Sequence, residues 1–268
     1  MVKLKFLALT LLGLLILAML IFVIWAKSPL GPMPEALAAM ESDQYVTVSA
    51  GPWYSFTPNN EEPTSGFIFY PGGRVDPRSY APLMREIAIH GTQAIIVPMP
   101  LNLAVLAPGK AAEVMQAYPE ITKWTIGGHS LGGSMAANFA ADHPGQVDGL
   151  VLLASYPASS DNLTETSIET ESIFGSLDGV ASLEKVKAAQ EQLPENTNWV
   201  EIEGGNHAQF GWYGPQPGDN TASISREEQQ NQALKAILEL LFRIEGDQSV
   251  PAIEDNALTL PLFDFVMA

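Results

Sequence analysis

Short apolar segments alternate with longer segments of helical character along most of the chain. Parallel strands must be joined by a crossover, usually a helix, so this alternation predicts one α/β domain whose mostly parallel sheet carries helices on both faces. The expected strands span residues 45–49, 53–57, 66–70, 93–97, 123–127, 149–154, 169–174 and 198–203, and the expected helices span 79–90, 110–118, 131–142, 182–193 and 226–242. Ligands of such sheets bind at the carboxyl ends of the strands, so functional residues should follow strands.

The N-terminal region contains an apolar run at residues 6–26, flanked by Lys3, Lys5 and Lys27. At about 1.5 Å per residue, the run spans roughly 30 Å, which is the thickness of the hydrocarbon core of a bilayer. It predicts a single membrane-spanning helix, and the lysine distribution favours a domain on the extracytoplasmic side. The alternative is an export signal that is cleaved near Ala38, which would release a secreted domain.

These features divide the chain into four parts. We expect a membrane anchor at 1–27, a stiff proline-containing linker at 28–43, the α/β domain at 44–245 and a tail at 246–268 that docks on the domain.

Composition excludes several kinds of site. The chain has no cysteine, and 30 acidic against 13 basic side chains give a net charge of −17. Disulfides and thiolate chemistry are therefore excluded, and nucleic-acid binding is not expected because polyphosphates would be repelled. The sequence has no recognisable metal-binding or dinucleotide-binding motif, so we expect no metal and no cofactor.

A G-x-S-x-G pattern occupies residues 128–132, directly between the expected strand 123–127 and the expected helix 131–142. At such a junction, a sharp turn exposes the serine hydroxyl group above the sheet, and glycines at positions 128 and 132 allow close backbone packing. Ser130 is therefore the candidate nucleophile. At this point the chain resembles the α/β-hydrolase superfamily, and specifically its small lipase-like or esterase-like serine hydrolases without a large cap domain.

A serine nucleophile needs a base, and the chain has four histidines. His90 and His143 lie at expected helix ends, and His129 is expected to point to the opposite side of the turn from Ser130. His207 follows the strand at 198–203, which is where the resemblance implies the base. The alternative for His207 is an ordinary surface loop residue.

The resemblance also implies an acid between the serine and the histidine in the chain. Asp178 follows the strand at 169–174 and fits the usual position of this acid; the alternative is a helix-capping or turn residue. Asp161, one strand earlier, is the second candidate.

The resemblance implies two backbone amides that stabilise the oxyanion. One is that of Leu131, which follows the nucleophile. The second comes from the segment Tyr70-Pro71-Gly72-Gly73-Arg74, in which proline replaces the usual histidine. Matching the remaining residues indicates the amide of Gly73, with that of Arg74 as the alternative.

Only fourteen residues separate position 154 from position 169, too few for a helical cap, so we expect an open site. The loop after His207 contains Phe210, Trp212 and Tyr213, which form either one wall of a substrate pocket or a packed edge of the sheet.

These observations favour a membrane-anchored serine hydrolase that cleaves carboxylic esters through an acyl-Ser130 intermediate, with His207 as the base and Asp178 as its orienting acid. Its expected partners are a small-molecule ester or acyl substrate and the membrane, and the oligomeric state is left open. An acyltransferase with the same residues, or a catalytically inactive binding domain, are the alternatives.

Overall fold

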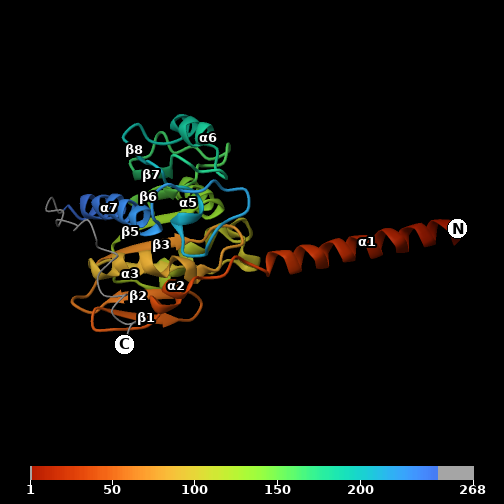
Figure 1. Ribbon diagram of the computed structural model, residues 1–268, viewed down its shortest axis with the longest axis horizontal. Helices are drawn as coiled ribbons and strands as arrows, with labels where there is room; N and C mark the ends of the chain where they lie inside the picture. The colour runs from red at the N-terminus through yellow and green to blue at the C-terminus, as the bar shows by residue number, and fades with distance from the viewer. Residues whose placement is uncertain (1, 247–268) are drawn as a thin grey trace.

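The computed structural model describes residues 2–246, so the tail expected at 246–268 lies outside the described residues except for Gly246. Eight strands form one sheet in the order β1-β2-β4-β3-β5-β6-β7-β8, running from bottom to top in Figure 1. The pairs β1-β2 and β2-β4 are antiparallel, and all other neighbours are parallel. The strands are β1 (Val46–Ala50), β2 (Tyr54–Pro58), β3 (Ser65–Tyr70), β4 (Gln93–Ile96), β5 (Lys123–His129), β6 (Gly149–Leu153), β7 (Glu169–Gly175) and β8 (Asn198–Ile202).

Helices cover both faces of this sheet (Figure 1). The α-helices are α1 (Val2–Ala26), α2 (Pro34–Ala38), α3 (Ala81–Ile89), α4 (Ala111–Ala117), α5 (Leu131–Asp142), α6 (Leu183–Ala188) and α7 (Arg226–Glu245). Short 3-10 turns are η1 (Pro77–Tyr80), η2 (Pro100–Asn102), η3 (Ala104–Leu106), η4 (Pro108–Lys110), η5 (Ala189–Glu191) and η6 (Ala208–Phe210). The expected mostly parallel α/β architecture is therefore confirmed.

The alternation of side chains along β3 explains the two layers of the core. Phe67 and Phe69 point to the face covered by α3 and α7, whereas Ile68 between them points to the face covered by α4 and α5. Successive strand residues face opposite sides of a sheet, so a strand that is apolar at every position must be buried on both faces.

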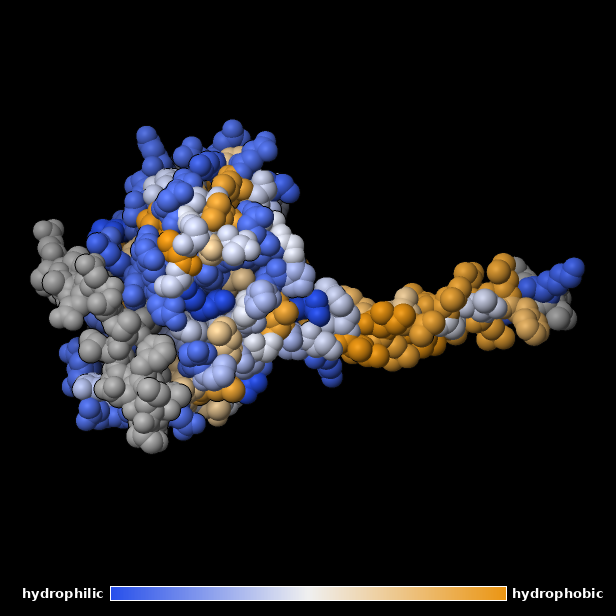
Figure 2. All heavy atoms as spheres, in the orientation of Figure 1, coloured by the Kyte–Doolittle hydropathy of each residue, from blue (hydrophilic) through white to orange (hydrophobic). Residues whose placement is uncertain are grey.

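Helix α1 extends away from the domain (Figure 1). Figure 2 shows that its surface is apolar along nearly its whole length, whereas most of the domain surface in this view is hydrophilic. The segment Lys5–Ala26 is long and apolar enough to cross a membrane, as judged by length and composition.

The segment 28–43, expected as a linker, is bound to the domain. Leu30 forms a parallel β-bridge with Val75, and the amide of Met33 donates to the carbonyl of Trp212 (2.8 Å). Helix α2, which was not expected, buries Ala36. Pro34 at its first turn suits a helix start, since proline lacks an amide hydrogen that would need a partner there.

Candidate active site

Ser130 lies at the turn between β5 and α5, with φ 54° and ψ −123°. A positive φ is costly for a residue with a Cβ, so the surrounding structure must hold it in place. The amide of Ser130 donates to the carbonyl of Leu153 (2.9 Å), and the hydroxyl group of Ser155 donates to the carbonyl of Ser130 (2.7 Å). The strained turn is thus fixed to the neighbouring strand β6.

The glycines around Ser130 are required by close backbone approach. A Cβ on Gly128 would lie 2.5 Å from the carbonyl carbon of Gly132. A Cβ on Gly132 would overlap the backbone of Tyr70. The G-x-S-x-G pattern therefore reflects the packing of α5 against β3 and β5, as expected from the sequence.

His207 and Asp178 are joined by a hydrogen bond between the histidine Nδ1 and the aspartate Oδ2, 2.8 Å long. Asp178 follows β7, His207 follows β8, and both side chains are buried. Because a carboxylate only accepts hydrogen bonds, Nδ1 of His207 carries the hydrogen and Nε2 is the acceptor. Within the described part of the chain, this Nε2 has no hydrogen-bond partner.

Asp178 also caps the segment that follows it. Its other oxygen, Oδ1, accepts hydrogen bonds from the amides of Val180 (2.8 Å) and Ala181 (2.7 Å). The two roles considered for Asp178 are therefore compatible, because each uses a different carboxylate oxygen. The capping bonds fix the orientation of the oxygen that faces His207.

Asp219 connects the loops of Asp178 and His207, and no sequence pattern pointed to this residue. Its Oδ2 accepts a hydrogen bond from the amide of Ala208 (2.8 Å). Its Oδ1 accepts from the amides of Gly179 (3.0 Å) and His207 (3.3 Å). Asp219 lies in a loop rich in glycine and proline, where an acidic residue is expected to be solvated.

The loop after β3 leaves one amide free in the described structure. The amide of Gly72 donates to the hydroxyl group of Tyr80 (3.0 Å), and that of Arg74 donates to the carbonyl of Asn102 (2.8 Å). Between them, the amide of Gly73 has no partner among residues 2–246. The alternative donor, Arg74, is therefore already engaged. The other expected donor is the amide of Leu131, the first residue of α5, where an amide has no acceptor within the helix.

His129 packs against the candidate base, His207. Its ring is fully buried, and its centroid lies 4.4 Å from that of His207. Burial is the main cause that lowers the pKa of His129 well below its usual value, and the neighbouring His207 lowers it further. His129 is therefore a neutral packing partner of His207.

The other residues that were weighed lie elsewhere. Asp161 accepts hydrogen bonds from Asn138 (3.2 Å) and Ser160 (2.9 Å), and among the described residues it forms no hydrogen bond or ion pair with His207. His90 and His143 bond to backbone carbonyls one turn earlier in their own helices, at 2.8 and 3.0 Å, as expected for helix ends.

The aromatic residues after His207 are buried within the domain. Phe210 and Tyr213 pack near His129, with ring centroids 6.0 and 6.2 Å away, and the amide of Trp212 donates to the carbonyl of Ser79 (2.7 Å). None of the three lines the cavity at Ser130. The geometry therefore favours the interpretation that these residues pack at the edge of the sheet over the interpretation that they form a wall of the substrate pocket.

A cavity of about 260 Å³ opens beside Ser130. It is lined by Ser130, Leu131, Ser134, Ala154, Ser155, Tyr156, Val180 and Ala181. Leu131, Ala154, Val180 and Ala181 supply its apolar lining, which suits the alkyl part of a bound acyl or alcohol group.

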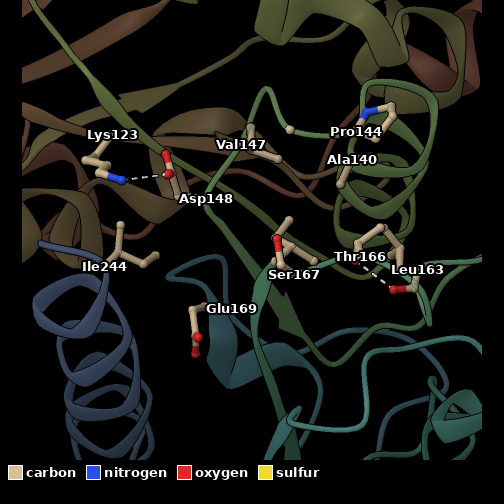
Figure 3. A pocket seen from close by; sticks show the side chains of 12 residues that line it. Lys123, Ala140, Pro144, Val147, Asp148, Leu163, Thr166, Ser167, Glu169 and Ile244 are labelled. Carbon is tan, nitrogen blue, oxygen red and sulfur yellow. Dashed lines mark hydrogen bonds and ion pairs between the residues drawn. The ribbon is translucent and has the colours of Figure 1, made fainter. Parts of the chain in front are cut away.

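A larger cavity of about 380 Å³ lies at the opposite edge of the sheet. Figure 3 shows Lys123 and Asp148 paired on one side of it and Glu169 nearby. Lys123 and Glu169 begin their strands, so this cavity is at the amino ends of the parallel strands. Its lining contains no histidine.

Among residues 2–246, no group of three histidine, cysteine or acidic side chains is arranged to hold a metal ion. The edge of the sheet near Ser130 presents a hydroxyl group, an imidazole, a carboxylate and backbone amides.

The fold is shared with known hydrolases. Est1E from Butyrivibrio proteoclasticus is similar with a TM-score of 0.52 at 13% identity, covering 74% of this chain and 99% of that chain. A predicted CIB-like hydrolase from Thermoplasma acidophilum has a TM-score of 0.50 at 14% identity, covering 60% and 89%. MGS-MChE2, an alpha/beta hydrolase enzyme from the metagenome of lagoon sediments at Mar Chica, Morocco, has a TM-score of 0.50 at 17% identity, covering 61% and 90%.

No curated protein sequence matches the chain. The model of the alpha/beta hydrolase family, in contrast, matches residues 66–231, more than half of the chain. This match contains both the turn at Ser130 and the pair formed by Asp178 and His207. The chain therefore belongs to the alpha/beta hydrolase family.

Proposed function

We propose that this protein is a membrane-anchored serine hydrolase that cleaves carboxylic esters through an acyl-Ser130 intermediate. The observation that carries the proposal is the buried hydrogen bond of 2.8 Å between His207 and Asp178. It leaves Nε2 of His207 free to accept a proton, at the same edge of the sheet where β5 ends in the strained turn of Ser130.

The reaction uses these groups in two steps. Nε2 of His207 takes the proton of the Ser130 hydroxyl group while the serine oxygen attacks the ester carbonyl carbon. The amides of Gly73 and Leu131 stabilise the resulting oxyanion, and His207 then gives its proton to the leaving alcohol. Water attacks the acyl-serine by the same route, which releases the carboxylic acid and restores the serine. Asp178 keeps the hydrogen of His207 on Nδ1 throughout.

The packing of the segment after α1 supports a retained anchor. Cleavage near Ala38 would remove Leu30 and its bridge to Val75, together with the buried Ala36, from the folded domain. An anchor with an extracytoplasmic domain predicts that protease added outside intact cells removes the domain. Complete protection would reverse the orientation, and a soluble form that begins near Ala39 would support the cleaved signal.

A fluorophosphonate probe tests the nucleophile directly, because it reacts with an activated serine. We expect the full-length protein to be labelled and Ser130→Ala to remain unlabelled. Ser134 lines the same cavity one turn into α5, so Ser134→Ala is the matched control and should keep its label. Labelling of Ser130→Ala, or no labelling of the unmodified protein, would contradict the proposal.

A further inference from the structure

The end of α1 is bound to the loop that carries the candidate oxyanion donor. Arg74, the residue after Gly73, donates from Nε to the carbonyl of Trp25 (2.9 Å) and from its terminal nitrogen to the carbonyl of Ser28 (2.8 Å). Its guanidinium group also lies 4.3 Å from the ring centre of Trp25. Ala26 is fully buried, so no free spacer separates the apolar helix from the domain.

Trp25 and Arg74 indicate where the membrane surface would lie. Tryptophan and arginine favour the boundary between hydrocarbon and headgroups, since each combines an apolar body with a polar group. Trp25 is 47% exposed at the last turn of α1, and Lys27 follows directly. The boundary of the bilayer is therefore expected within one helical turn of the Arg74 contact.

The neighbouring loop 100–107 presents apolar side chains beside this joint. Asn102 connects the loop to the helix, because its side-chain nitrogen donates to the carbonyl of Ala26 (2.9 Å). Val105 and Leu106 are 53% and 50% exposed. Among the described residues beyond α1, they are the only exposed large apolar side chains adjacent in the chain.

The charge of this region also suits a lipid surface. The chain as a whole carries a net charge of −17, which opposes contact with anionic lipids. The stretch 97–112, however, contains no carboxylate side chain and one lysine. With Lys27 and Arg74 next to it, this part of the surface is neutral to positive.

The same loop leads to the candidate active site. Turn η3, which holds Val105 and Leu106, packs against α5, the helix that begins directly after Ser130. A Cβ on Gly73 would meet Leu131 at 3.2 Å and Leu103 at 3.9 Å. Apolar side chains therefore extend from the anchor joint, along the loop, to the oxyanion loop.

We propose that loop 100–107 inserts into the membrane leaflet next to the end of α1, and that the substrates are esters whose acyl chains are embedded in that leaflet. This inference rests on the proposed hydrolase function and adds its substrate class. A domain fixed to its helix by Arg74, Asn102 and Leu30 holds Ser130 in one orientation to the bilayer. An embedded acyl chain then reaches the site along the apolar loop without first entering water.

The first test compares two esters with the full-length protein in phosphatidylcholine nanodiscs. One is 4-nitrophenyl acetate, which is soluble, and the other is 4-methylumbelliferyl oleate, which resides in the bilayer. We expect Leu106→Asp to lower kcat/KM at least tenfold for the oleate ester and to change it less than twofold for the acetate ester. Tyr45→Asp is the matched control, because Tyr45 is an exposed apolar residue just before β1, on the antiparallel edge of the sheet. It should change neither rate.

The second test measures membrane contact without catalysis. Because the chain has no cysteine, Leu106→Cys and Tyr45→Cys each introduce a single thiol for a nitroxide label. In nanodiscs, the label at position 106 should be more accessible to oxygen than to a water-soluble nickel complex. The label at position 45 should show the opposite preference.

The outcomes separate this inference from the proposed function. Three results would overturn the membrane-facing site while leaving a serine hydrolase. The first is an equal loss of activity of Leu106→Asp on both esters. The others are hydrolysis of the acetate but not the oleate ester by the unmodified protein, and equal solvent access at the two labels. Absence of fluorophosphonate labelling would instead remove the proposed function, and the label accessibilities would still test whether the loop enters the bilayer.

Discussion

Tyr80 and His129 are joined by a buried hydrogen bond of 2.9 Å between the tyrosine hydroxyl group and Nδ1 of the histidine. The amide of Gly72 donates to the same hydroxyl group (3.0 Å), so Tyr80 connects Gly72 to His129. These hydrogen bonds fix the position of Gly72, the residue before Gly73, relative to the buried His129. They support the loop next to Pro71, the position at which the resemblance implied a histidine.

Removal of the Tyr80 hydroxyl group should impair catalysis more than binding. In Tyr80→Phe, the amide of Gly72 loses its acceptor, and the Gly73 amide next to it is held less firmly. We expect kcat on a soluble ester to fall about tenfold, with a smaller change in KM, because oxyanion donors act mainly in the transition state. Tyr118→Phe is the control, since its hydroxyl group bonds to Trp53 and Ser55 instead. Equal loss of kcat in both variants would contradict a positioning role for Tyr80.

The two candidate acids can be separated by paired substitutions. Asp178→Asn preserves the shape of the side chain but favours the wrong tautomer of His207, so kcat should fall by about 10³–10⁴-fold. Asp161→Asn should leave kcat within a factor of about two, because Asp161 bonds to Asn138 and Ser160. Steady-state kinetics on one soluble ester decides between them. A severe loss in Asp161→Asn with an active Asp178→Asn would reverse the assignment.

Asp219 should act as a positioning residue for His207. Asp219→Ala leaves the amides of Gly179, His207 and Ala208 without their acceptor, and we expect kcat to fall about 10- to 100-fold and stability to fall by about 1–3 kcal/mol. Asp219→Asn keeps one acceptor oxygen and should restore part of both. Asp148→Ala is the comparison, because Asp148 accepts from the amide of Trp124 at the other end of the sheet. Asp148→Ala should lower the unfolding temperature while kcat stays unchanged. A loss of kcat in Asp148→Ala similar to that in Asp219→Ala would show that destabilisation alone explains the effect of the Asp219 substitution.

Glu86 should make the stability of the domain depend on pH. Burial in α3 raises the pKa of Glu86 to about 7, from an ordinary value near 4.5. As the pH rises from about 4.5 to about 7, the unfolded chain releases this proton before the folded domain does, so the free energy of unfolding decreases. Glu86→Gln removes this decrease.

The variant should therefore be more stable than the unmodified protein at pH 8 by about 1–3 kcal/mol and equally stable near pH 4.5. Denaturant unfolding at the two pH values measures the difference. The exposed Glu120 provides the control, since Glu120→Gln should change stability little at either pH. A constant difference between Glu86→Gln and the unmodified protein across this range would contradict a raised pKa.

The repeating layers of the fold were predictable from local sequence. Each expected strand exists, and α5 begins at Leu131 and ends at Asp142 as expected, because glycines and a strand-to-helix turn mark its start. The expected helix at 79–90 begins instead with η1, since the side chain of Asp76 accepts from the amide of Arg78 and starts a 3-10 turn before α3. Local periodicity does not distinguish these two kinds of turn.

Contacts between distant segments were not predictable in the same way. The proximity of His129 to His207 depends on how the loop after β8 folds over β5, and the role of Asp219 depends on two loops meeting. The prolines at 29–34 indicated a stiff spacer, but the bridge between Leu30 and Val75 is a long-range contact without a local signal. The burial of Phe210 likewise follows from packing around His129.

The hydrogen bonds from Arg74 to the carbonyls of Trp25 and Ser28, at the end of α1, have a mechanical consequence. A spanning helix tilts when the bilayer around it is thinner than its apolar length. If the 25-residue helix α1 spans a membrane, as proposed, its tilt acts on Arg74, the residue directly bonded to Gly73. A change in bilayer thickness would then load the loop that contains Gly73, whereas a domain joined to its helix by a flexible linker would not experience this load.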